Sequence, residues 1–537
     1  MAQNGITIKN FANAVGGVFY NGGVPYDSTG ALLVDGSIWN KPGRPTYALL
    51  GDSIVAKQNA YATLDSVSFA NGVLTCNIAA GHNAWTGARI KITAPNQTAI
   101  FGNSTATGTT SFTIPASAAP TGTVTYMNLD VLQDTGFMGM ANAMMGGCLS
   151  YTVNAAVGGE SSTQTLARVN DAISNAFLTS SPTYCIVHTG TNDIIGMGAA
   201  TAAATAATIK TNLAAIYTAL LNAGIVPIAS TILPIDNTYA GYAATWAQTI
   251  MRVRDWMFDY CSKNPRILLF DGYQAVVNPL SATANFTAAN TVDHVHPSKQ
   301  GCLVLAQALE LLLSECVPQY TRISTVNGSG GSPAGVGSYG SSTDNPELID
   351  NALMTGTGGT STNTAGGTVT GPTGAAVIPA GFTVQNTGNA GQTISIGVVP
   401  SSDGIGQDLI ITFTSAAAGD GFNVKKSAPA PFARWNAGDV VQFETRVSGS
   451  GIGTGVLQYI NCCCNITVST VASGPYAISS NGTDTYQSDF DMTLAAPPLT
   501  VPASGVTNGT PSVFVTHAAA GTATYRISGW SLRKVQA

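Results

Sequence analysis

Charged residues are scarce in this chain of 537 residues, because Asp, Glu, Lys and Arg make up only 9% of it and the formal net charge is −6. No cluster of Lys and Arg occurs, so the chain lacks the electrostatic footprint of a protein that binds nucleic acid or an anionic membrane. Hydroxyl and amide side chains take the place of ions at the surface. This composition favours sugar or peptide surfaces as partners and predicts no nucleic-acid partner.

A secretory signal and a membrane span are also missing from the pattern. The first five residues are not a basic region leading into an apolar stretch, so we expect no signal peptide and synthesis in the cytoplasm. The Ala- and Thr-rich segment 199–224 is interrupted by Lys210, Asn212 and Asn222, which makes it too polar to cross a bilayer. We therefore expect no membrane insertion.

Groups that bind metals are few. Of five histidines, only His294 and His296 lie close together, and no carboxylate cluster stands beside them to complete a site. We expect neither a metal nor a cofactor.

The nine cysteines do not suggest a disulfide framework. Cys148, Cys185 and Cys302 lie in apolar runs, which favours buried free thiols. In the consecutive run 462–464 the side chains would alternate faces of a strand, so one outward thiol could be reactive, although core packing is the favoured interpretation.

An apolar run that ends on a sharp polar turn organises the chain. Residues 47–50 are Tyr-Ala-Leu-Leu, and Gly51, Asp52 and Ser53 follow. Such a run is typical of a buried parallel strand, whose C-terminal end lies at the sheet edge where open α/β folds place their chemistry. Ser53 would have its hydroxyl exposed there, although a simple capped turn is the alternative for any single Gly-Asp-Ser.

Partners for a nucleophilic serine appear later in the chain. A weak alcohol nucleophile needs a base within hydrogen-bond reach, and that base needs an acceptor that fixes its tautomer. Asp293 and His296, three residues apart in a loop, could supply both. The spacing to Asp293 and the following Pro297 favour His296 over His294, and His188 inside a strand is interpreted as a core or edge imidazole.

Two further turns follow apolar runs and should reach the same edge. They carry Gly158 and Gly159 after 149–157, and Asn192 after 184–187. The N–H groups of Ser53 and Gly159 and the amide of Asn192 could converge on a developing oxyanion, with Gly158 as an alternative donor. Capping of turns explains Asp52 and Asp193 without chemistry.

These four blocks, in this order, resemble those of the SGNH (GDSL-type) hydrolase family. The resemblance implies Ser53 as nucleophile, His296 as general base, Asp293 as its orienting group, and Ser53, Gly159 and Asn192 as oxyanion hole. It also implies a flavodoxin-like three-layer α/β/α fold over 47–62 and 132–317. The pattern itself predicts five parallel strands with helical crossovers, including helices over 163–178, 203–223, 243–263 and 298–316.

The remaining chain reads as β structure. Residues 1–46 form a strand-and-turn lead-in or attachment segment, and 63–131 is a small antiparallel β domain inserted beside the nucleophile, resembling modules of bacteriophage tail proteins. A Gly- and Ser-rich linker over 318–345 leads to 346–537, a predicted jelly-roll β-sandwich that loosely resembles carbohydrate-binding modules. Trp435, Tyr476 and Trp530 are candidates for stacking on sugars, with core filling as the open alternative.

Together these features predict a serine esterase that removes O-acetyl groups from a polysaccharide, a bacterial capsule or O-antigen, as part of a phage tail spike. The expected location is the virion, with attachment to the tail and a possible homotrimer. A lipid or thioester hydrolase of the same family is the alternative, and a non-catalytic glycan-binding adhesin is the alternative from another class.

Overall fold

The structure is a computed structural model. Of the lead-in predicted over 1–46, it describes a hairpin of β1 (Phe19–Asn21) and β2 (Val24–Tyr26). Most of the linker predicted over 318–345 lies outside the described residues, although Ser324 and Asn327 are buried. The described residues are 19–21, 24–26, 45–95, 97–173, 182–317, 324, 327, 347–363, 366–426, 436–453, 455–468, 471–473, 476–479, 484–501 and 506–534.

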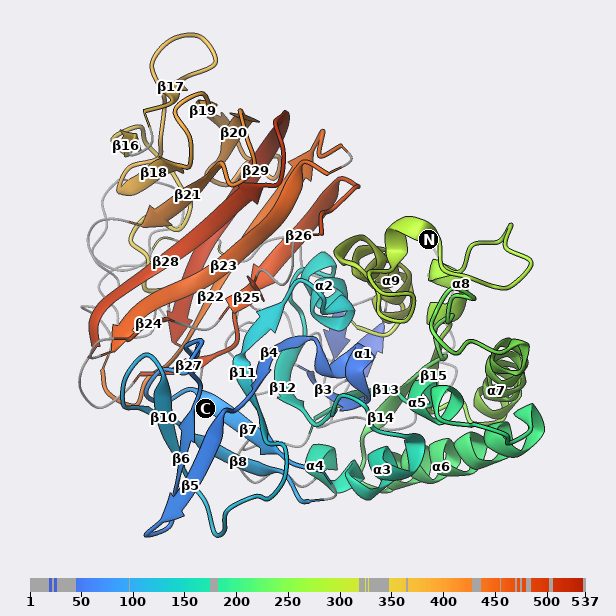
Figure 1. The fold of residues 1–537 in the computed structure, drawn as a ribbon. Coiled ribbons are helices and arrows are strands. Elements are labelled where there is room, and N and C mark those ends of the chain that lie inside the picture. The colour runs from blue at the N-terminus through green and yellow to red at the C-terminus, as the bar shows by residue number, and fades with distance from the viewer. Residues whose placement is uncertain are drawn as a thin grey trace.

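A parallel sheet of five strands forms the centre of the α/β part (Figure 1). The side-by-side order is β12-β3-β13-β14-β15, and every neighbouring pair is parallel. Counted along the chain, this is the order 2-1-3-4-5 of flavodoxin-like sheets, so the predicted doubly wound fold is confirmed. The strands are β3 (Thr46–Gly51), β12 (Ser150–Asn154), β13 (Tyr184–His188), β14 (Val226–Ser230) and β15 (Leu268–Phe270).

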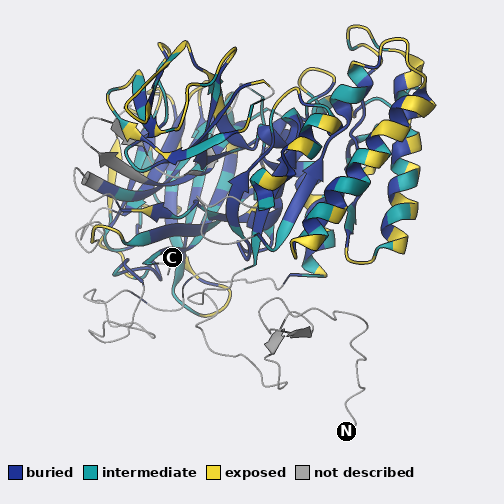
Figure 2. Cartoon of the chain, turned by 90° about the horizontal axis from the view of Figure 1, so that it is seen from below, coloured by how far each residue is buried: buried dark blue, intermediate teal, exposed yellow. Residues whose placement is uncertain are grey.

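Helices cover both faces of this sheet. On one side α2 packs against α9, and on the other α6 packs against α3, α4 and α7 (Figure 1). Their buried stripes face the sheet and their exposed residues face outward, as amphipathic patterning requires (Figure 2). The helices are α1 (Ser53–Ala56), α2 (Phe137–Met144), α3 (Ser162–Ala167), α4 (Val169–Ile173), α5 (Thr191–Ile195), α6 (Ala202–Asn222), α7 (Ala244–Lys263), α8 (Gly272–Val276), the short 3₁₀ helix η3 (Ala288–Asn290) and α9 (Lys299–Ser314).

The single helix predicted over 163–178 is wrong in its described part, because two short helices, α3 and α4, occupy 162–173. The break lies at Arg168. Its N–H bonds in a tight turn to the carbonyl of Thr165 at 3.1 Å, and its guanidinium reaches Glu160 at 2.5 Å. Helix α3 therefore ends next to Arg168, whose side chain contacts the loop before the helix.

The inserted region is antiparallel within itself, as predicted. Among the described residues, its strands β5, β6, β9 and β10 form one sheet, and β4, β7, β8 and β11 belong to a second. The second sheet continues into the C-terminal region, because β11 pairs in parallel with β25. The strands are β4 (Asn59–Thr63), β5 (Ser66–Ala70), β6 (Val73–Asn77), β7 (Arg89–Thr93), β8 (Ile100–Asn103), β9 (Thr105–Ala106), β10 (Ser111–Pro115) and β11 (Thr125–Gln133).

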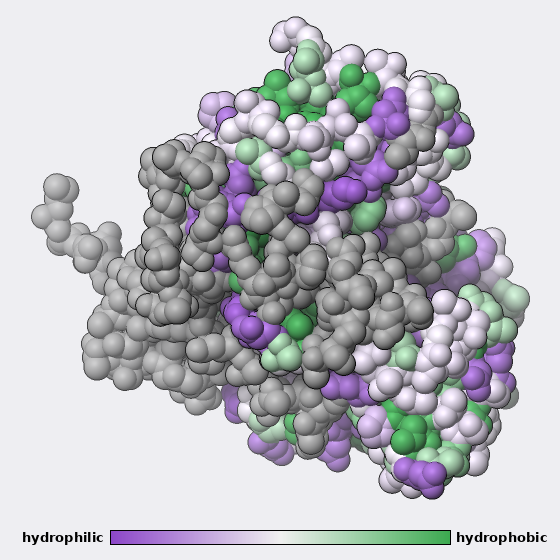
Figure 3. All heavy atoms as spheres, turned by 90° about the vertical axis from the view of Figure 1, so that its left-hand side faces the viewer, coloured by the Kyte–Doolittle hydropathy of each residue, from purple (hydrophilic) through white to green (hydrophobic). Residues whose placement is uncertain are grey.

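Two sheets make up the described C-terminal region, and their order is β16-β18-β21-β28-β23-β25 in one and β17-β19-β20-β29-β22-β26 in the other. The jelly-roll description stays a prediction. Where Figure 3 colours the face that it shows, pale residues of neutral hydropathy lie among smaller hydrophilic and hydrophobic areas. The strands are β16 (Thr360–Asn363), β17 (Thr368–Thr370), β18 (Phe382–Thr387), β19 (Thr393–Pro400), β20 (Gln407–Ser415), β21 (Gly421–Lys426), β22 (Val440–Ser450), β23 (Leu457–Val468), β24 (Val471–Ser473), β25 (Tyr476–Ser479), β26 (Phe490–Ala495), β27 (Leu499–Thr500), β28 (Val506–His517) and β29 (Gly521–Lys534).

All nine cysteines are free thiols. Cys148, Cys185 and Cys302 are buried, as predicted, and so are all three of the run 462–464. Burial raises the pKa of the Cys462, Cys463 and Cys464 thiols. The alternative of an outward, reactive thiol in this run is therefore wrong, and core packing accounts for all three side chains.

The prediction that Trp530 stacks on sugar is also wrong. Its ring is 0% exposed and packs between the two C-terminal sheets, with ring centroids 5.3 Å from Phe382 on β18 and 4.9 Å from Phe443 on β22. An aromatic ring fills such a space because it buries a large apolar area. Trp435 and the side chain of Tyr476 lie outside the described residues, so their roles stay predictions.

Replacing this ring tests its place in the core. Trp530→Ala should lower the free energy of unfolding by about 3–5 kcal/mol, the usual cost of removing a buried aromatic side chain. Equilibrium denaturation by urea measures the change. Val399→Ala, at a position 37% exposed on β19, is the control and should change it by less than about 0.5 kcal/mol. A loss below about 1 kcal/mol for Trp530→Ala would contradict the buried position.

Candidate active site

Ser53 begins α1 directly after the central strand β3, at the C-terminal edge of the sheet. The turn needs glycine at position 51, because φ there is +147° and a Cβ would lie 1.8 Å from the carbonyl oxygen of His188. Asp52 caps the helix, since its Oδ1 accepts a hydrogen bond from the N–H of Ile54 at 3.0 Å. The backbone is thus fixed on both sides of the point where the Ser53 side chain leaves it.

His296 lies in a tight turn between η3 and α9. Asp293 builds this turn, because its Oδ1 accepts hydrogen bonds from the N–H groups of Val295 at 3.2 Å and His296 at 2.8 Å. His294 between them adopts a φ of +73°. The carbonyl of His296 accepts hydrogen bonds from Val292 and Thr291, which ties the turn to the preceding segment.

The structure brings the three predicted residues together. Nε2 of His296 lies 2.8 Å from Oγ of Ser53, and its Nδ1 lies 2.6 Å from Oδ2 of Asp293. A carboxylate only accepts, so Nδ1 carries the hydrogen and donates it to Asp293. Nε2 is then free to accept the hydroxyl proton of Ser53. This is the tautomer that a general base needs.

The charge on Asp293 supports this assignment. Partial burial raises the pKa of its carboxyl, but the hydrogen bonds from the side chain and backbone of His296 and from the N–H of Val295 outweigh that effect and hold the pKa well below its usual range. Asp293 is therefore ionised at neutral pH. Its negative charge stabilises an imidazolium at His296.

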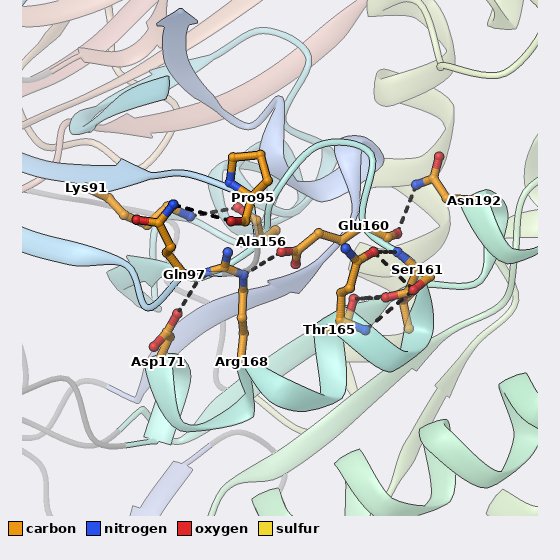
Figure 4. Close-up of polar contacts among 12 residues, drawn as sticks. Lys91, Pro95, Gln97, Ala156, Glu160, Ser161, Thr165, Arg168, Asp171 and Asn192 are labelled. Atoms are coloured by element: carbon orange, nitrogen blue, oxygen red, sulfur yellow. Dashed lines mark hydrogen bonds and ion pairs between the residues drawn. The ribbon is translucent and has the colours of Figure 1, made fainter. Parts of the chain in front are cut away.

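The predicted oxyanion donors lie on neighbouring elements of the same edge. The loop after β12 carries Gly158, where an added Cβ would lie 3.8 Å from Cβ of Ser53, and Gly159, which has a φ of +82° and open space beside it. Asn192 lies on α5, after β13, and its Nδ2 donates to the carbonyl of Glu160 at 3.0 Å (Figure 4). The amide of Asn192 is thereby tied to the loop that carries both glycines.

The side chains of the two other candidate histidines, His294 and His188, bond to residues other than Ser53. Nδ1 of His294 lies 3.0 Å from Oγ1 of Thr238 and 3.2 Å from Oδ2 of Asp236, and its side chain is half-exposed. His188 is buried inside β13, where burial lowers its pKa to about 3 and keeps the ring neutral. The ring of His294 thus bonds to Thr238 and Asp236, and the ring of His188 bonds to Ser230.

Asp193 serves structure, as its turn position suggested. It accepts hydrogen bonds from the N–H of Ser162 at 2.6 Å and from its hydroxyl at 2.7 Å. It therefore ties α5, which carries Asn192, to the start of α3.

Asn154, at the end of β12, is a residue whose role sequence reasoning missed. Its amide donates to the carbonyls of Val55 and Ala56 at the end of α1 and to Oδ1 of Asn59, while its own Oδ1 accepts from the N–H of Ala156. It thus links the helix that begins with Ser53 to the loop with the glycines. Nothing in the local sequence marks it, because its partners are about a hundred residues away.

A parallel sheet with a Ser-His-Asp arrangement at its C-terminal edge defines the class of α/β hydrolases that act by a serine nucleophile. Residues 100–302 match the model of the GDSL-like lipase/acylhydrolase family. The chain therefore contains an acylhydrolase domain of this GDSL (SGNH) family. The matched stretch holds Gly159, Asn192, Asp293 and His296, whereas Ser53 lies before it and is brought to the others by the fold.

Solved structures of the family are similar to part of the chain. A putative acylhydrolase from Bacteroides fragilis has 24% identity and a TM-score of 0.25, with 31% of this chain and 73% of that chain covered. A putative lipolytic protein of the G-D-S-L family from Desulfitobacterium hafniense has 19% identity and a TM-score of 0.26, covering 33% and 89%. The lipase/acylhydrolase from Enterococcus faecalis has 16% identity and a TM-score of 0.26, covering 32% and 80%. No curated protein matches the chain.

The buried Asp52 gives the fold a pH dependence that can be tested. Burial raises its pKa to about 7, so the native state keeps the proton after the unfolded chain has lost it near its ordinary pKa of 3.8. Stability should therefore fall as the pH rises from about 4 to about 7 and stay low above that.

Asp52→Asn has no proton to lose and still caps α1. Its free energy of unfolding should match the wild type near pH 4 and exceed it by up to about 4 kcal/mol above pH 7. Urea denaturation across this pH range measures the difference, and Asp255→Asn, at an exposed position on α7, is the control. A difference that stays constant with pH would show that Asp52 ionises normally.

Proposed function

We propose that this protein is a serine esterase that removes O-acetyl groups from a polysaccharide, as part of a phage tail spike. The observation that carries the esterase assignment is the chain of two hydrogen bonds from Ser53 through His296 to Asp293, at 2.8 and 2.6 Å. A serine hydroxyl is a poor nucleophile until such a base removes its proton.

Acylation of the enzyme is the first half of the reaction. Oγ of Ser53 attacks the carbonyl carbon of the acetyl ester while Nε2 of His296 takes the hydroxyl proton. The negative charge moves to the carbonyl oxygen, where the N–H groups of Ser53 and Gly159 and the amide of Asn192 would donate to it. The carbon–oxygen bond to the sugar then breaks, and His296 gives its proton to the leaving sugar oxygen, which departs as a hydroxyl.

Deacylation repeats these steps with water. His296 takes a proton from a water molecule, whose oxygen attacks the acetyl group on Ser53. The second tetrahedral intermediate collapses, Ser53 leaves with the proton from His296, and acetate is released. Asp293 holds the imidazole in one tautomer through both halves and stabilises its charged form.

The inserted β region supports a polar, sugar-like substrate. It lies directly after the turn that carries Ser53, and in its described part the exposed large apolar residues are Tyr61, Phe69 and Val73, all 42% exposed or less. A hydrolase of long acyl chains needs a larger continuous apolar surface. Scarce charge over the whole chain also suits neutral hydroxyl groups as ligands.

The proposal of a phage tail protein is supported by the amino-acid pattern of the inserted region and by the β-rich C-terminal region. The inserted region resembles modules of phage tail proteins, and the C-terminal sheets suit a rigid β-rich particle component. We place the protein in the virion, attached to the tail through its lead-in, with a homotrimer as the proposed assembly. Within the part of the chain that the structure describes, no helix is both long and apolar enough to cross a membrane.

One observation favours the lipid or thioester alternative. Val292, next to Asp293 in sequence, is 54% exposed. An apolar side chain at that place could contact an acyl chain longer than acetyl. The two substrate classes differ in the length of the acyl chain, so an assay with esters of different acyl length distinguishes them.

Removal of the proposed nucleophile is the first test. Ser53→Ala should lower the rate of p-nitrophenyl acetate hydrolysis by about 10³-fold or more, because the remaining groups cannot form the acyl-enzyme. Thermal unfolding should be unchanged, and Ser262→Ala, an exposed position on α7, is the matched control. Equal rates for wild type and Ser53→Ala would remove the esterase and leave a non-catalytic, glycan-binding adhesin.

Acetate release tests the substrate class. Incubation with a panel of acetylated bacterial capsules and O-antigens should release acetate from at least one of them, and base-deacetylated samples of the same glycans are the controls. Activity on p-nitrophenyl palmitate and on palmitoyl-CoA should be much lower than on the acetyl ester. Faster cleavage of the long-chain substrates, with no acetate from any glycan, would favour the lipid or thioester hydrolase instead.

A further inference from the structure

The strand β12, which leads to the two glycines, is an edge strand of the parallel sheet. On its inner side, the N–H groups of Ala155 and Val157 donate to the carbonyls of Leu49 and Gly51 on β3, at 2.7 and 2.9 Å. Because the backbone groups of successive residues in an extended chain point to opposite sides, the carbonyls of 154 and 156 face away from the sheet. Such an edge needs donors from outside.

The inserted region supplies these donors with side chains. On β7, Nη1 of Arg89 donates to the carbonyl of Thr152 at 3.1 Å, and Nζ of Lys91 donates to the carbonyls of Asn154 and Ala156, both at 2.7 Å. Arg89 and Lys91 are two residues apart and thus share one face of their strand. Two side chains therefore take the place of a neighbouring strand along the end of β12.

Lys91 is 1% exposed, and its charge is balanced by a small ionic cluster (Figure 4). Arg168 lies 2.5 Å from Glu160 and 3.7 Å from Asp171, and these three groups are the charged neighbours of the ammonium. Burial lowers the pKa of Lys91 to about 7, while Asp171 and Glu160 oppose that shift. Burying an amine costs free energy unless it is hydrogen-bonded, and here the two carbonyls of Asn154 and Ala156 supply the hydrogen bonds.

The other end of the glycine loop is held by the same cluster. The carboxylate of Glu160 binds Arg168, and the carbonyl of Glu160 accepts the hydrogen bond from Asn192. Lys91 thus fixes the loop two residues before Gly158, and Arg168 fixes it one residue after Gly159 (Figure 4).

We propose that the inserted β region positions the oxyanion hole, and that Lys91 is the positioning residue through which it acts. Lys91 touches no reacting atom in this account. It holds the backbone of Asn154 and Ala156, so that the glycine N–H and the Asn192 amide face the place where the ester oxygen becomes negative. This role rests on the proposed esterase function.

The test replaces the ammonium by an apolar group of similar length. Lys91→Met should lower kcat for p-nitrophenyl acetate by about 10-fold or more and leave KM within about threefold, because a misplaced donor loses part of the 10²–10³-fold effect of an oxyanion contact. Ser104→Ala is the matched control. The Ser104 hydroxyl is also buried in the inserted region and donates to two carbonyls, of Trp85 and Ala88, but does not contact the glycine loop.

Thermal unfolding of each variant shows the folded fraction, by which kcat is corrected. The proposal is overturned if Lys91→Met keeps its corrected kcat within about twofold of wild type, or if Ser104→Ala loses as much. Should Lys91→Met fail to fold, Lys91→Gln decides, since its shorter amide weakens the contact of the inserted region with the carbonyls of Asn154 and Ala156. A corrected kcat reduced about threefold or more supports the proposal, and an unchanged one overturns it.

The wild type and Ser53→Ala separate this proposal from the proposed function. If the wild type hydrolyses the ester and Ser53→Ala does not, the esterase stands whatever Lys91→Met shows. If the two are equal, the esterase itself fails, and Lys91 has no oxyanion hole to position.

Discussion

The active-site account depends on one hydrogen bond, between Oγ of Ser53 and Nε2 of His296, which joins residues 243 positions apart. Ser53 stands where β3 ends and His296 just before α9 begins, so the bond requires the whole parallel sheet to be in register. Gly51 and Asp52 fix the first residue and Asp293 fixes the second. Each side is thus held by its own turn, and the N–H of Asp52 also donates to the carbonyl of His188 on the neighbouring strand β13.

The inserted region and the C-terminal region contact the α/β part on either side of the bond between Ser53 and His296. On the glycine side, Lys91 of the inserted region binds the end of β12. On the histidine side, Lys299, three residues after His296, donates from its N–H to the carboxylate of Asp484 and from Nζ to the carbonyl of Gln458 in the C-terminal region. Because β11 and β25 pair, one continuous sheet joins these two outer regions.

Local chemistry explains what the sequence could predict. Ser53, Asp293 and His296 could be found because each lies in a short turn with a distinctive sequence, Gly-Asp-Ser or Asp-x-x-His. The alternation of apolar runs and helices predicted five parallel strands with helical crossovers, whereas their side-by-side order comes from the structure. The prediction for Trp530 was wrong because the sequence pattern of a strand is the same whether its aromatic side chain faces solvent or a second sheet. Lys91 and Asn154 were missed because their partners lie about 60 to 100 residues away, and only the fold pairs them.

The most direct measurement of the central claim is covalent labelling by a fluorophosphonate, which reacts with a serine only when a neighbouring base activates it. The account predicts one adduct, located by mass spectrometry on the peptide that contains Ser53, and its loss in His296→Ala with the fold retained. An adduct on another serine, or labelling of Ser53 that persists without His296, would contradict the pairing of these two residues.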